Sequence, residues 1–413
     1  MQLVERTIIK QSDPRYAVID TAAFAAKNLY NLALYEWRQA YIHEHRYLSL
    51  SEVYQRMKQS DAYKALPRKV SIDVLRQLDK AWRAFREARK AWYEHPELFT
   101  GRPNIPKYKH KTQGRFLLTY DKQAISRIAL KKRGMLAPSG LGIEVPTKQP
   151  ATAIQQARIV PRNGYYIVEV VYEQAIKQAP VNPAYYAGID IGTNNLAALT
   201  SNKPGFTPLV INGRPVKSVN QYYNKRYKQL KKKLPKAERH TVTRRMERIT
   251  ARRTRRIDHY LHTASKRIID ILVQEGIGTL VIGKNDGWKQ DVNMGKRNNQ
   301  NFVQIPHARF IDMLTYKALL VGIQVIVTEE SYTSAASFLD RDPLPSYNAK
   351  NDEKQPFSGT RVKRGLYRAS DGRYINADCN GSYNIVRKVA PNVFGSEGVE
   401  DVAVHPVRIT LAK

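Results

Sequence analysis

The stretch Tyr186-Ala187-Gly188-Ile189-Asp190-Ile191-Gly192-Thr193-Asn194-Asn195-Leu196-Ala197-Ala198-Leu199 decides the fold of the second half of this chain. Two apolar runs flank a glycine that permits a tight reversal, which predicts a β-hairpin. Asp190 lies at the end of the first run, where a buried carboxylate is costly unless a cation or hydrogen-bond donors accompany it. The residue is either a turn aspartate bonded to its own backbone or part of a site, and the hairpin alone leaves both open.

Further along, a strand, a helix and a second strand follow one another. Residues 278–283 and 323–328 are apolar strands, and residues 301–320 form a helix with Pro306 near its first turn. This order predicts a βαβ unit with parallel pairing. The second strand ends in Glu329-Glu330, and functional groups in open sheets gather beyond the carboxyl ends of strands.

A third acid, Asp378, lies where an irregular segment becomes a helix, with Asn380 and Asn384 about one helical turn apart. Three acids from distant parts of a basic chain suit two hard cations with oxygen ligands. Two Mg²⁺ ions would activate a water molecule and stabilise the departing oxygen in phosphodiester hydrolysis. Each acid also has a structural explanation, since Asp378 could cap its helix and the glutamates could be a solvated strand end.

The charge balance indicates a polyanionic partner. The 413 residues include 69 Lys and Arg against 36 Asp and Glu, a formal net charge of +33, and such a surplus suits nucleic-acid phosphates. Residues 225–256 hold fifteen cations and two acids, and their mutual repulsion favours a bound nucleic acid over a merely solvated face. The candidate contacts in this basic helical segment are Lys231, Lys232, Arg244, Arg245, Arg252, Arg253, Arg255 and Arg256.

Several classes of protein are excluded. Cys379 is the only cysteine, so disulfides within the chain and a cysteine-rich zinc site are impossible, and residues 335–375 contain neither Cys nor His. No apolar run approaches the roughly 18 residues of a membrane span, and the N-terminus lacks a signal-peptide pattern. We therefore expect a cytoplasmic protein that faces nucleic acid, with no membrane partner and no zinc.

The length predicts two to three domains. In the first half, residues 1–10 are expected to form a strand, followed by helices over 19–42, 50–59 and 71–93. Five short strands are then expected over 115–120, 125–130, 143–146, 152–160 and 165–172, and residues 174–184 are a linker. Short strands at this spacing predict a small barrel or sandwich, which the first strand completes with the helices as an insertion.

The ordered motifs resemble the TnpB (OrfB) family of transposon-associated RNA-guided DNA nucleases, from which type V CRISPR effectors descend. The matching motifs are Gly188-Ile189-Asp190-Ile191-Gly192 with Asn195-Leu196-Ala197, Arg255 with Asp258, His262 and Ser265, Leu314-Thr315-Tyr316-Lys317-Ala318 with Gly322-Ile323, Tyr332-Thr333-Ser334, Asn376-Ala377-Asp378 with Asn380-Gly381 and Asn384-Ile385, and Lys27-Asn28-Leu29-Tyr30-Asn31-Leu32-Ala33-Leu34.

This resemblance implies an α+β multidomain protein in which a β-barrel (wedge) domain carrying a helical recognition insert precedes a ribonuclease H-like (RuvC) α/β domain. The expected boundaries are 1–12 for the first wedge strand, 13–100 for the recognition helices, 101–180 for the rest of the wedge, 181–388 for the RuvC domain with a basic helical segment at 217–275 and a target-binding loop at 334–375 in place of a zinc ribbon, and 389–413 for a loosely ordered tail.

The resemblance also implies a prokaryotic protein that has access to the nucleoid, and it implies the activity and its partners. An RNA derived from the transposon end would guide the protein to double-stranded DNA beside a short flanking motif, and a companion single-strand transposase would act on the same element. Asp190, Glu330 and Asp378 would bind two Mg²⁺ ions and catalyse hydrolysis. The other implied nucleic-acid contacts are Tyr30, Asn31, Arg76, Arg83, Arg361, Lys363 and Arg364.

One position departs from the family pattern. The usual second acid would stand at the end of the 278–283 strand, where this chain has Gly283, and a similar branch of the family carries Glu-Glu-Ser-Tyr-Thr-Ser on the next strand. Glu330, with Glu329 as the alternative, is expected to replace the missing acid, because strand alternation lets only one of the two face the metals. Gly283 leaves a nuclease-inactive RNA-guided repressor open, and a guide-free DNA-joining transposase is a third hypothesis.

Overall fold

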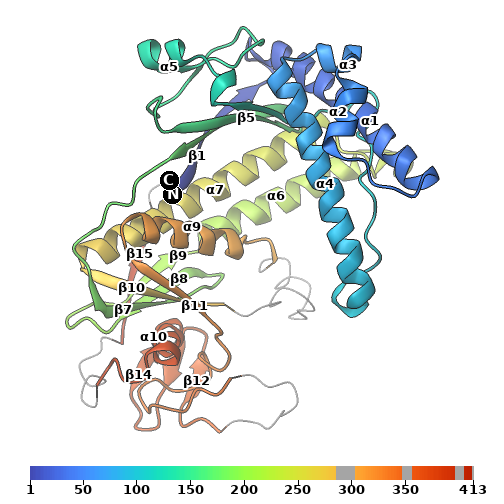
Figure 1. Ribbon diagram of the computed structural model, residues 1–413. Coiled ribbons are helices and arrows are strands. Elements are labelled where there is room, and N and C mark those ends of the chain that lie inside the picture. Colours follow the sequence, from blue (N-terminus) through green and yellow to red (C-terminus); the bar gives the residue numbers. More distant parts are fainter. Residues whose placement is uncertain (285–302, 347–355, 396–403, 412–413) are drawn as a thin grey trace. The chain divides into compact units, whose positions relative to one another are not determined.

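The computed structural model describes residues 1–284, 303–346, 356–395 and 404–411. The chain divides into two compact units, Met1–Gln174 and Ala175–Lys413, which are described separately below (Figure 1). Parts of the helix expected over 301–320, of the expected target-binding loop and of the tail lie outside the described residues. None of the helices in the described ranges combines the length and apolarity of a membrane span.

The first unit is built on a four-stranded antiparallel sheet in the order β1-β6-β5-β2. Its strands are β1 (Gln2–Lys10), β2 (Leu118–Asp121), β5 (Ile154–Arg162) and β6 (Tyr165–Glu173). The pairing of β1 with β6 along its whole length confirms that the first strand joins the later ones across the helical insertion. Residues 1–174 are all described, and β1 and β2 are the free edges of this sheet, so the expected closed barrel is not formed.

The expectation of a strand over residues 125–130 is wrong. The chain forms a helix there, α5 (Arg127–Arg133), and a separate two-stranded pair, β3 (Met135–Leu136) with β4 (Val145–Pro146), follows it. The Ser126 side chain caps the helix by accepting a hydrogen bond from the backbone of Ala129, and Gly134 ends it in the left-handed region. These two capping signals outweigh the short apolar run.

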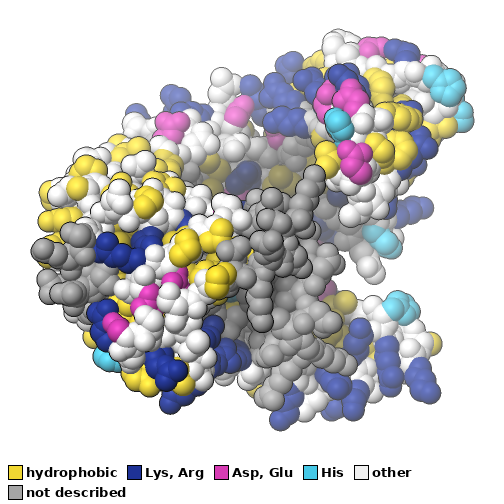
Figure 2. All heavy atoms as spheres, turned by 90° about the horizontal axis from the view of Figure 1, so that it is seen from below, with side chains coloured by type: hydrophobic (Ala, Val, Ile, Leu, Met, Phe, Trp, Pro, Cys, Tyr) yellow, Lys and Arg dark blue, Asp and Glu magenta, His cyan; other side chains and the backbone are white. Residues whose placement is uncertain are grey.

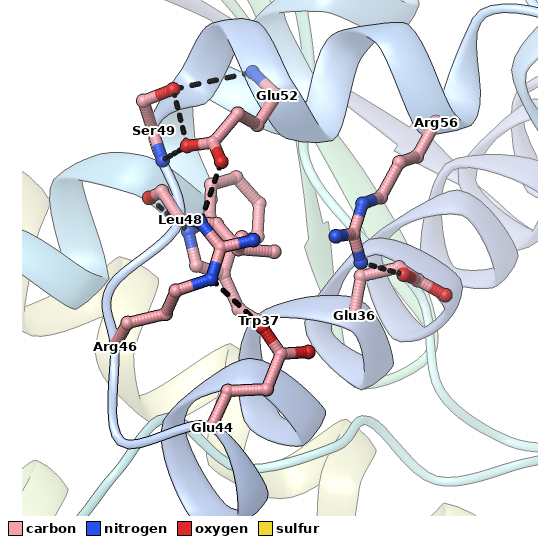
Figure 3. A network of polar contacts seen from close by, with 8 residues as sticks. All are labelled: Glu36, Trp37, Glu44, Arg46, Leu48, Ser49, Glu52 and Arg56. Carbon is pink, nitrogen blue, oxygen red and sulfur yellow. Dashed lines mark hydrogen bonds and ion pairs between the residues drawn. The ribbon is translucent and has the colours of Figure 1, made fainter.

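Four helices lie between β1 and β2: α1 (Tyr16–His43), α2 (Leu50–Met57), the unexpected single turn α3 (Asp61–Lys64) and α4 (Arg68–Glu94). Their aromatic side chains form the core, as expected, with Trp37, Trp82 and Phe85 buried. Figure 3 shows how α2 begins: Ser49 and Glu52 form a reciprocal capping box. The indole of Trp37 donates to the carbonyl of Leu48, which fixes the preceding turn to α1.

The second unit contains a six-stranded sheet in the order β11-β10-β7-β8-β9-β15. Its strands are β7 (Asn182–Asp190), β8 (Asn195–Ser201), β9 (Leu209–Asn212), β10 (Ile277–Gly283), β11 (Gln324–Thr328) and β15 (Val407–Ile409). The antiparallel pairing of β7 with β8 confirms the hairpin, and the parallel pairing of β7, β10 and β11 confirms the βαβ unit. The expectation of a loosely ordered tail is wrong for β15, which pairs with β9.

Helices cover both faces of this sheet (Figure 1). On one face lie α6 (Arg214–Lys232), α7 (Arg244–Gln274) and α9 (His307–Leu320), whose apolar residues share a core with the strands. On the other face α10 (Ala377–Val389) packs against β7 and β8. A small three-stranded sheet, β12 (Thr360–Lys363), β13 (Leu366–Arg368) and β14 (Tyr374–Asn376), leads directly into α10.

Candidate active site

Asp190 lies where β7 ends against the first turns of α10. The hydroxyl of Ser382 donates to the carbonyl of Gly188 at 2.8 Å, and a Cβ at Gly188 would lie 2.3 Å from the Ser382 carbonyl oxygen. A Cβ at Gly381 would likewise lie 2.9 Å from Oδ2 of Asp190. Only glycine at positions 188 and 381 therefore allows the helix to approach the strand so closely, and this approach brings the Asp190 carboxylate onto α10.

Asp378 is in the first turn of the same helix. Asn376, and not Asp378, caps α10 by accepting hydrogen bonds from the backbone of residues 378 and 379, which contradicts the helix-cap explanation of Asp378. The carboxylate of Asp378 accepts a 2.6 Å hydrogen bond from Nδ2 of Asn195, at the start of β8. The guanidinium of Arg361, on β12, lies 3.8 Å from the other carboxylate oxygen. Strand β8, the small sheet and α10 thus meet at this acid.

Glu330 occupies the space that Gly283 leaves vacant. A Cβ at Gly283 would lie 2.7 Å from Oε2 and 3.1 Å from Cβ of Glu330. Glu329 turns to a different partner, because its carboxylate accepts hydrogen bonds from the ammonium of Lys388 and from the backbone of Ser331. The two neighbouring glutamates follow the last residue of β11 and have different surroundings, and Glu330 is the one that lies beside the end of β10.

The pKa values show that these acids interact. Loss of hydration on burial raises the pKa of Asp190 to about 8, and the negative charges of Glu330 and Asp378 add to this effect while Arg361 opposes it. Burial followed by the charge of Glu329 raises the pKa of Glu330 to about 7. Burial would also raise the pKa of Glu329, but its hydrogen bonds with Lys388 and Ser331 outweigh burial and lower it. At Asp190 and Glu330, burial and the neighbouring carboxylates therefore outweigh the opposing charges of Arg361 and Lys388.

A cavity of about 550 Å³ opens over Asp190, Asn195 and Asp378. The cations that line it are Arg214, Lys217, Arg361, Arg364 and Arg408. An acidic floor with a basic rim suits a phosphodiester, whose phosphate the rim would attract while the acids bind metal. Of the predicted nucleic-acid-binding residues, Arg361 and Arg364 line this cavity, whereas Lys363 is exposed on the same strand as Arg361 and does not. Of the three predicted acids, Asp190 and Asp378 line it and Glu330 does not.

Sequence reasoning missed Asn195, Arg214, Lys217 and Arg408 as members of this site. Asn195 belongs to the motif Asn195-Leu196-Ala197, so the sequence did contain a signal that this residue is part of the site. Arg408 could not have been found, because the pairing of β15 with β9, which carries it to the cavity, has no local signature in a three-residue strand.

The donor atoms suit Mg²⁺. The acids and amides supply oxygen ligands, which this hard cation prefers, and Oδ1 of Asn195 is buried without a hydrogen-bond partner among the described residues. In the described ranges no group of three or more His, Cys, Asp or Glu side chains is close enough to enclose an ion by itself. This is compatible with Mg²⁺, which keeps several water ligands and takes only one or two carboxylates per ion.

Two asparagines of α10 hold the segment that follows Glu330. Nδ2 of Asn384 donates to the carbonyls of Thr333 and Ala336 at 3.0 and 2.8 Å. Asn380 donates to the carbonyl of Ala336 and accepts from the backbone of Phe338. Both side chains are fully buried, so they position residues 333–338 and are not free to bind a ligand.

We expect Asn384→Asp to destabilise the protein by about 1–3 kcal/mol, because it replaces the amide donor of two buried bonds by an oxygen while keeping the size of the side chain. Urea unfolding measures the loss, and amide hydrogen exchange should rise in residues 333–338. Asn392→Ala, at an exposed position of the tail, is the matched control. Unchanged stability in Asn384→Asp would show that these bonds do not hold the segment.

Two of the predicted nucleic-acid residues are engaged inside the first unit. Tyr30 is only 6% exposed and packs on Phe116, so its ring is not offered to a ligand in the described fold. Asn31 exchanges two 2.9 Å hydrogen bonds with the backbone of Lys109, and the buried ammonium of Lys27 donates to the carbonyl of Lys111. This motif thus braces the basic segment 107–111.

The remaining predicted cations are mostly exposed. Arg76 projects from α4, and Arg83 forms a 2.8 Å ion pair with Asp79. Among the predicted cations of α6 and α7, Arg253 is half-buried and bonded to Asn220. The exposed ones are Lys231, Lys232, Arg244, Arg245, Arg252, Arg255 and Arg256. On the face shown in Figure 2, Lys and Arg side chains form broad groups, and Asp and Glu are scattered.

Sequence and structure comparisons relate the chain to known proteins. Residues 168–289 match the OrfB_IS605 family model, described as "Probable transposase", and residues 307–385 match the "Cas12f1-like, TNB domain" model. A curated relative, the "CRISPR-associated endodeoxyribonuclease Cas12f2" of Micrarchaeota archaeon (strain CG1_02_47_40), is 25% identical over 270 residues. That alignment covers 59% of this chain but 44% of the relative, so the chain spans less than half of the relative's length.

The solved structures that the chain matches include a Cas12f1–sgRNA–target DNA complex, with a TM-score of 0.36, 13% identity and coverage of 93% of this chain and 98% of the other. The mini-RNA-guided endonuclease CRISPR-Cas_phi3 has a TM-score of 0.44, 10% identity and coverage of 98% and 94%. Over residues 168–289 and 307–385 the chain is therefore similar to the OrfB_IS605 transposases and to the TNB domain of Cas12f1-like proteins, which agrees with the resemblance found in its motifs.

Proposed function

We propose that the protein is an RNA-guided DNA endonuclease of an insertion-sequence element, with a ribonuclease H-like (RuvC) second unit. The observation that carries the proposal is the position of Glu330, whose carboxylate fills the space left by Gly283 at the end of β10. A third acid thereby accompanies Asp190 and Asp378, at the end of a sheet in which the parallel strands β10 and β11 adjoin the β7–β8 hairpin. The similarity to a protein named as an endodeoxyribonuclease supports the same chemistry.

In this proposal Asp190, Glu330 and Asp378 hold two Mg²⁺ ions. Bound Mg²⁺ supplies Lewis acidity toward the phosphate and lowers the pKa of a water molecule so that it becomes a nucleophile. Asn195 fixes the orientation of Asp378 by its 2.6 Å hydrogen bond, and Lys388 keeps Glu329 away from the site. The cations at the rim, Arg361 among them, bind the phosphates on either side of the scissile bond.

Guide RNA and target DNA are the proposed partners, and a companion single-strand transposase would act on the same element. The net charge of +33 supports a polyanionic partner. Base pairing would read the target sequence and the protein only a short flanking motif. A nuclease-inactive repressor is the alternative that Gly283 leaves open, and the position of Glu330 beside Gly283 supports the nuclease over the repressor.

Expression together with the neighbouring genomic DNA tests the proposal. We expect RNA to co-purify with the protein, and sequencing should place the end of this RNA in the flanking DNA. The complex should cut a duplex that matches the guide in the presence of Mg²⁺ and not in the presence of EDTA. Co-purifying RNA without cleavage would favour the repressor, and DNA joining without RNA would favour a guide-free transposase; either result would overturn the proposal.

A further inference from the structure

A second cavity, of about 380 Å³, lies between α6 and α7, away from the carboxylates. Its size is within the range of clefts that bind small ligands. Its chemistry is distinctive, because two tyrosines and four arginines line it and none of its lining residues is acidic. These six residues are Tyr222, Tyr223, Arg226, Arg252, Arg253 and Arg256.

The floor of this cleft is held in place by contacts. Nε of Arg253 donates to Oδ1 of Asn220 at 2.6 Å, and the guanidinium lies 5.0 Å from the centre of the Tyr223 ring. The hydroxyl of Tyr223 lies 3.1 Å from Oγ1 of Thr250, on the facing helix. Arg253 and Tyr223 therefore join α6 to α7, and this explains why Arg253 is half-buried among otherwise exposed cations.

An exposed tyrosine ring and three arginines lie at the mouth of the cleft. Tyr222 is 65% exposed. Arg252 and Arg256 are one turn apart on α7, and neither they nor Arg226 form an ion pair with a described residue. A single exposed tyrosine needs no explanation. A free tyrosine beside uncompensated guanidinium groups, however, has the two elements by which proteins bind single-stranded nucleic acids, a stacking platform and a basic groove.

We propose that the cleft between α6 and α7 binds one unpaired nucleotide of a single-stranded nucleic acid, with its base stacked on Tyr222 and its flanking phosphates on Arg252 and Arg256. Stacking on Tyr222 needs an exposed base face, which a base inside a duplex does not offer. The inference depends on the proposed function only in taking a nucleic acid as the partner, and it involves none of the three acids.

Binding measurements on the full-length protein, freed of RNA, test the cleft. The probes are labelled single-stranded RNA, single-stranded DNA of the same sequence and the corresponding DNA duplex. Tyr222→Ala should weaken single-strand binding roughly tenfold and leave duplex binding within twofold, whereas Tyr222→Phe, which keeps the ring, should bind as the wild type. The RNA and DNA arms show which strand supplies the nucleotide.

The salt dependence separates stacking from charge. Arg252→Ala should lower the slope of log Kd against log salt by about 1, because one phosphate contact is lost, and Tyr222→Ala should not change it. Lys266→Ala, on the same helix but in an ion pair with Asp270, is the control for Arg252. An oligonucleotide that carries 5-iodouracil should also photo-crosslink to Tyr222, which mass spectrometry would locate.

These measurements distinguish failure of the nucleotide cleft from failure of the proposed function. If the wild type binds no nucleic acid, both the cleft and the proposed function are wrong. If the wild type binds single strands and Tyr222→Ala binds them equally well, or loses single-strand and duplex binding alike, only the nucleotide cleft is wrong. Since Tyr222 is exposed, the variant should keep the thermal unfolding temperature of the wild type, and this confirms that binding is compared between folded proteins.

Discussion

Asp190→Asn is expected to abolish Mg²⁺-dependent cleavage and, at the same time, to stabilise the metal-free protein at neutral pH. The amide keeps the size of the carboxylate but cannot give its charge to a metal ion, so cleavage should fall by roughly a thousandfold or more. The gain in stability has a separate cause, which is the raised pKa of Asp190, about 8 in the folded chain.

The sign of the pH effect follows from this pKa. The ordinary pKa of an aspartate is 3.8, so between about pH 4 and pH 8 the unfolded chain has released this proton while the folded chain retains it. The free energy of unfolding therefore falls as the pH rises through this window. Glu330, with a pKa of about 7 against 4.5, contributes a slope of the same sign over a narrower range.

Asp190→Asn has no proton to release, so it should lose its part of this slope and be more stable than the wild type by about 1–3 kcal/mol at pH 8 in EDTA. Urea unfolding from pH 5 to pH 8 measures the slope. Mg²⁺ should raise the unfolding temperature of the wild type, because it binds the folded state, and should do so much less in the variant.

Asp371→Asn is the matched control. The backbone and side-chain hydrogen bonds of Arg373 lower the pKa of Asp371, so its replacement should not stabilise the protein and should leave cleavage unchanged. Cleavage by Asp190→Asn at the rate of the wild type would contradict the assignment of the site. A variant that lacks activity but is less stable than the wild type in EDTA would contradict the electrostatic explanation.

The sequence predicted the elements whose signals are local. The hairpin of β7 and β8, the βαβ unit and the start of α10 each follow from a run of residues and its punctuation. Local capping also explains why residues 127–133 form a helix where a strand was expected. Ser126 and Gly134 are the two capping residues of this helix, and both are visible in the sequence. The expected barrel failed for a different reason, because closure depends on strand pairing between β1 and β2 that no local pattern specifies.

The candidate site also depends on contacts between distant residues, which no local sequence pattern specifies. Motifs identified Asp190 and Asp378, but only the packing of α10 on Gly188 and Gly381 explains how the two acids come together. The alternation of strand residues predicts that only one of Glu329 and Glu330 faces the metals, and Glu330 was expected with Glu329 as the alternative. Lys388 lies 59 residues further along the chain, its side chain is only 6% exposed, and it decides between the two glutamates by binding Glu329. The sequence around Glu329 and Glu330 gives no sign that Lys388, on α10, binds one of them.

Exchange of Glu330 for a glutamate at position 283 is the second experiment with a large expected effect. Glu330→Ala should reduce cleavage by roughly a thousandfold, because the site loses one of its three acids. Adding Gly283→Glu should restore cleavage at least about tenfold above that variant, since the Cβ of residue 283 would point into the space that the Glu330 side chain occupied, 2.7 Å from its Oε2.

The single variant Gly283→Glu should behave in the opposite way. With Glu330 present its Cβ would meet Cβ of Glu330 at 3.1 Å and Cδ1 of Ile385 at 2.6 Å. It would also add a fourth carboxylate beside acids whose pKa values burial and neighbouring carboxylates already raise. We therefore expect it to be less stable and less active than the wild type. The two substitutions should thus be strongly non-additive, as expected for side chains that compete for one place.

Two controls make this exchange decisive. Gly283→Ala in the Glu330→Ala background adds a methyl group without a carboxylate at this place, so it should not restore cleavage. Glu329→Gln should keep cleavage within a few fold, because Glu329 pairs with Lys388 outside the site. If Glu330→Ala cuts as well as the wild type while Glu329→Gln does not, the acids are reversed. If the wild type itself fails to cut while binding its guide and target, then Glu330 fills the space of the missing acid without its function, and the repressor is the correct description.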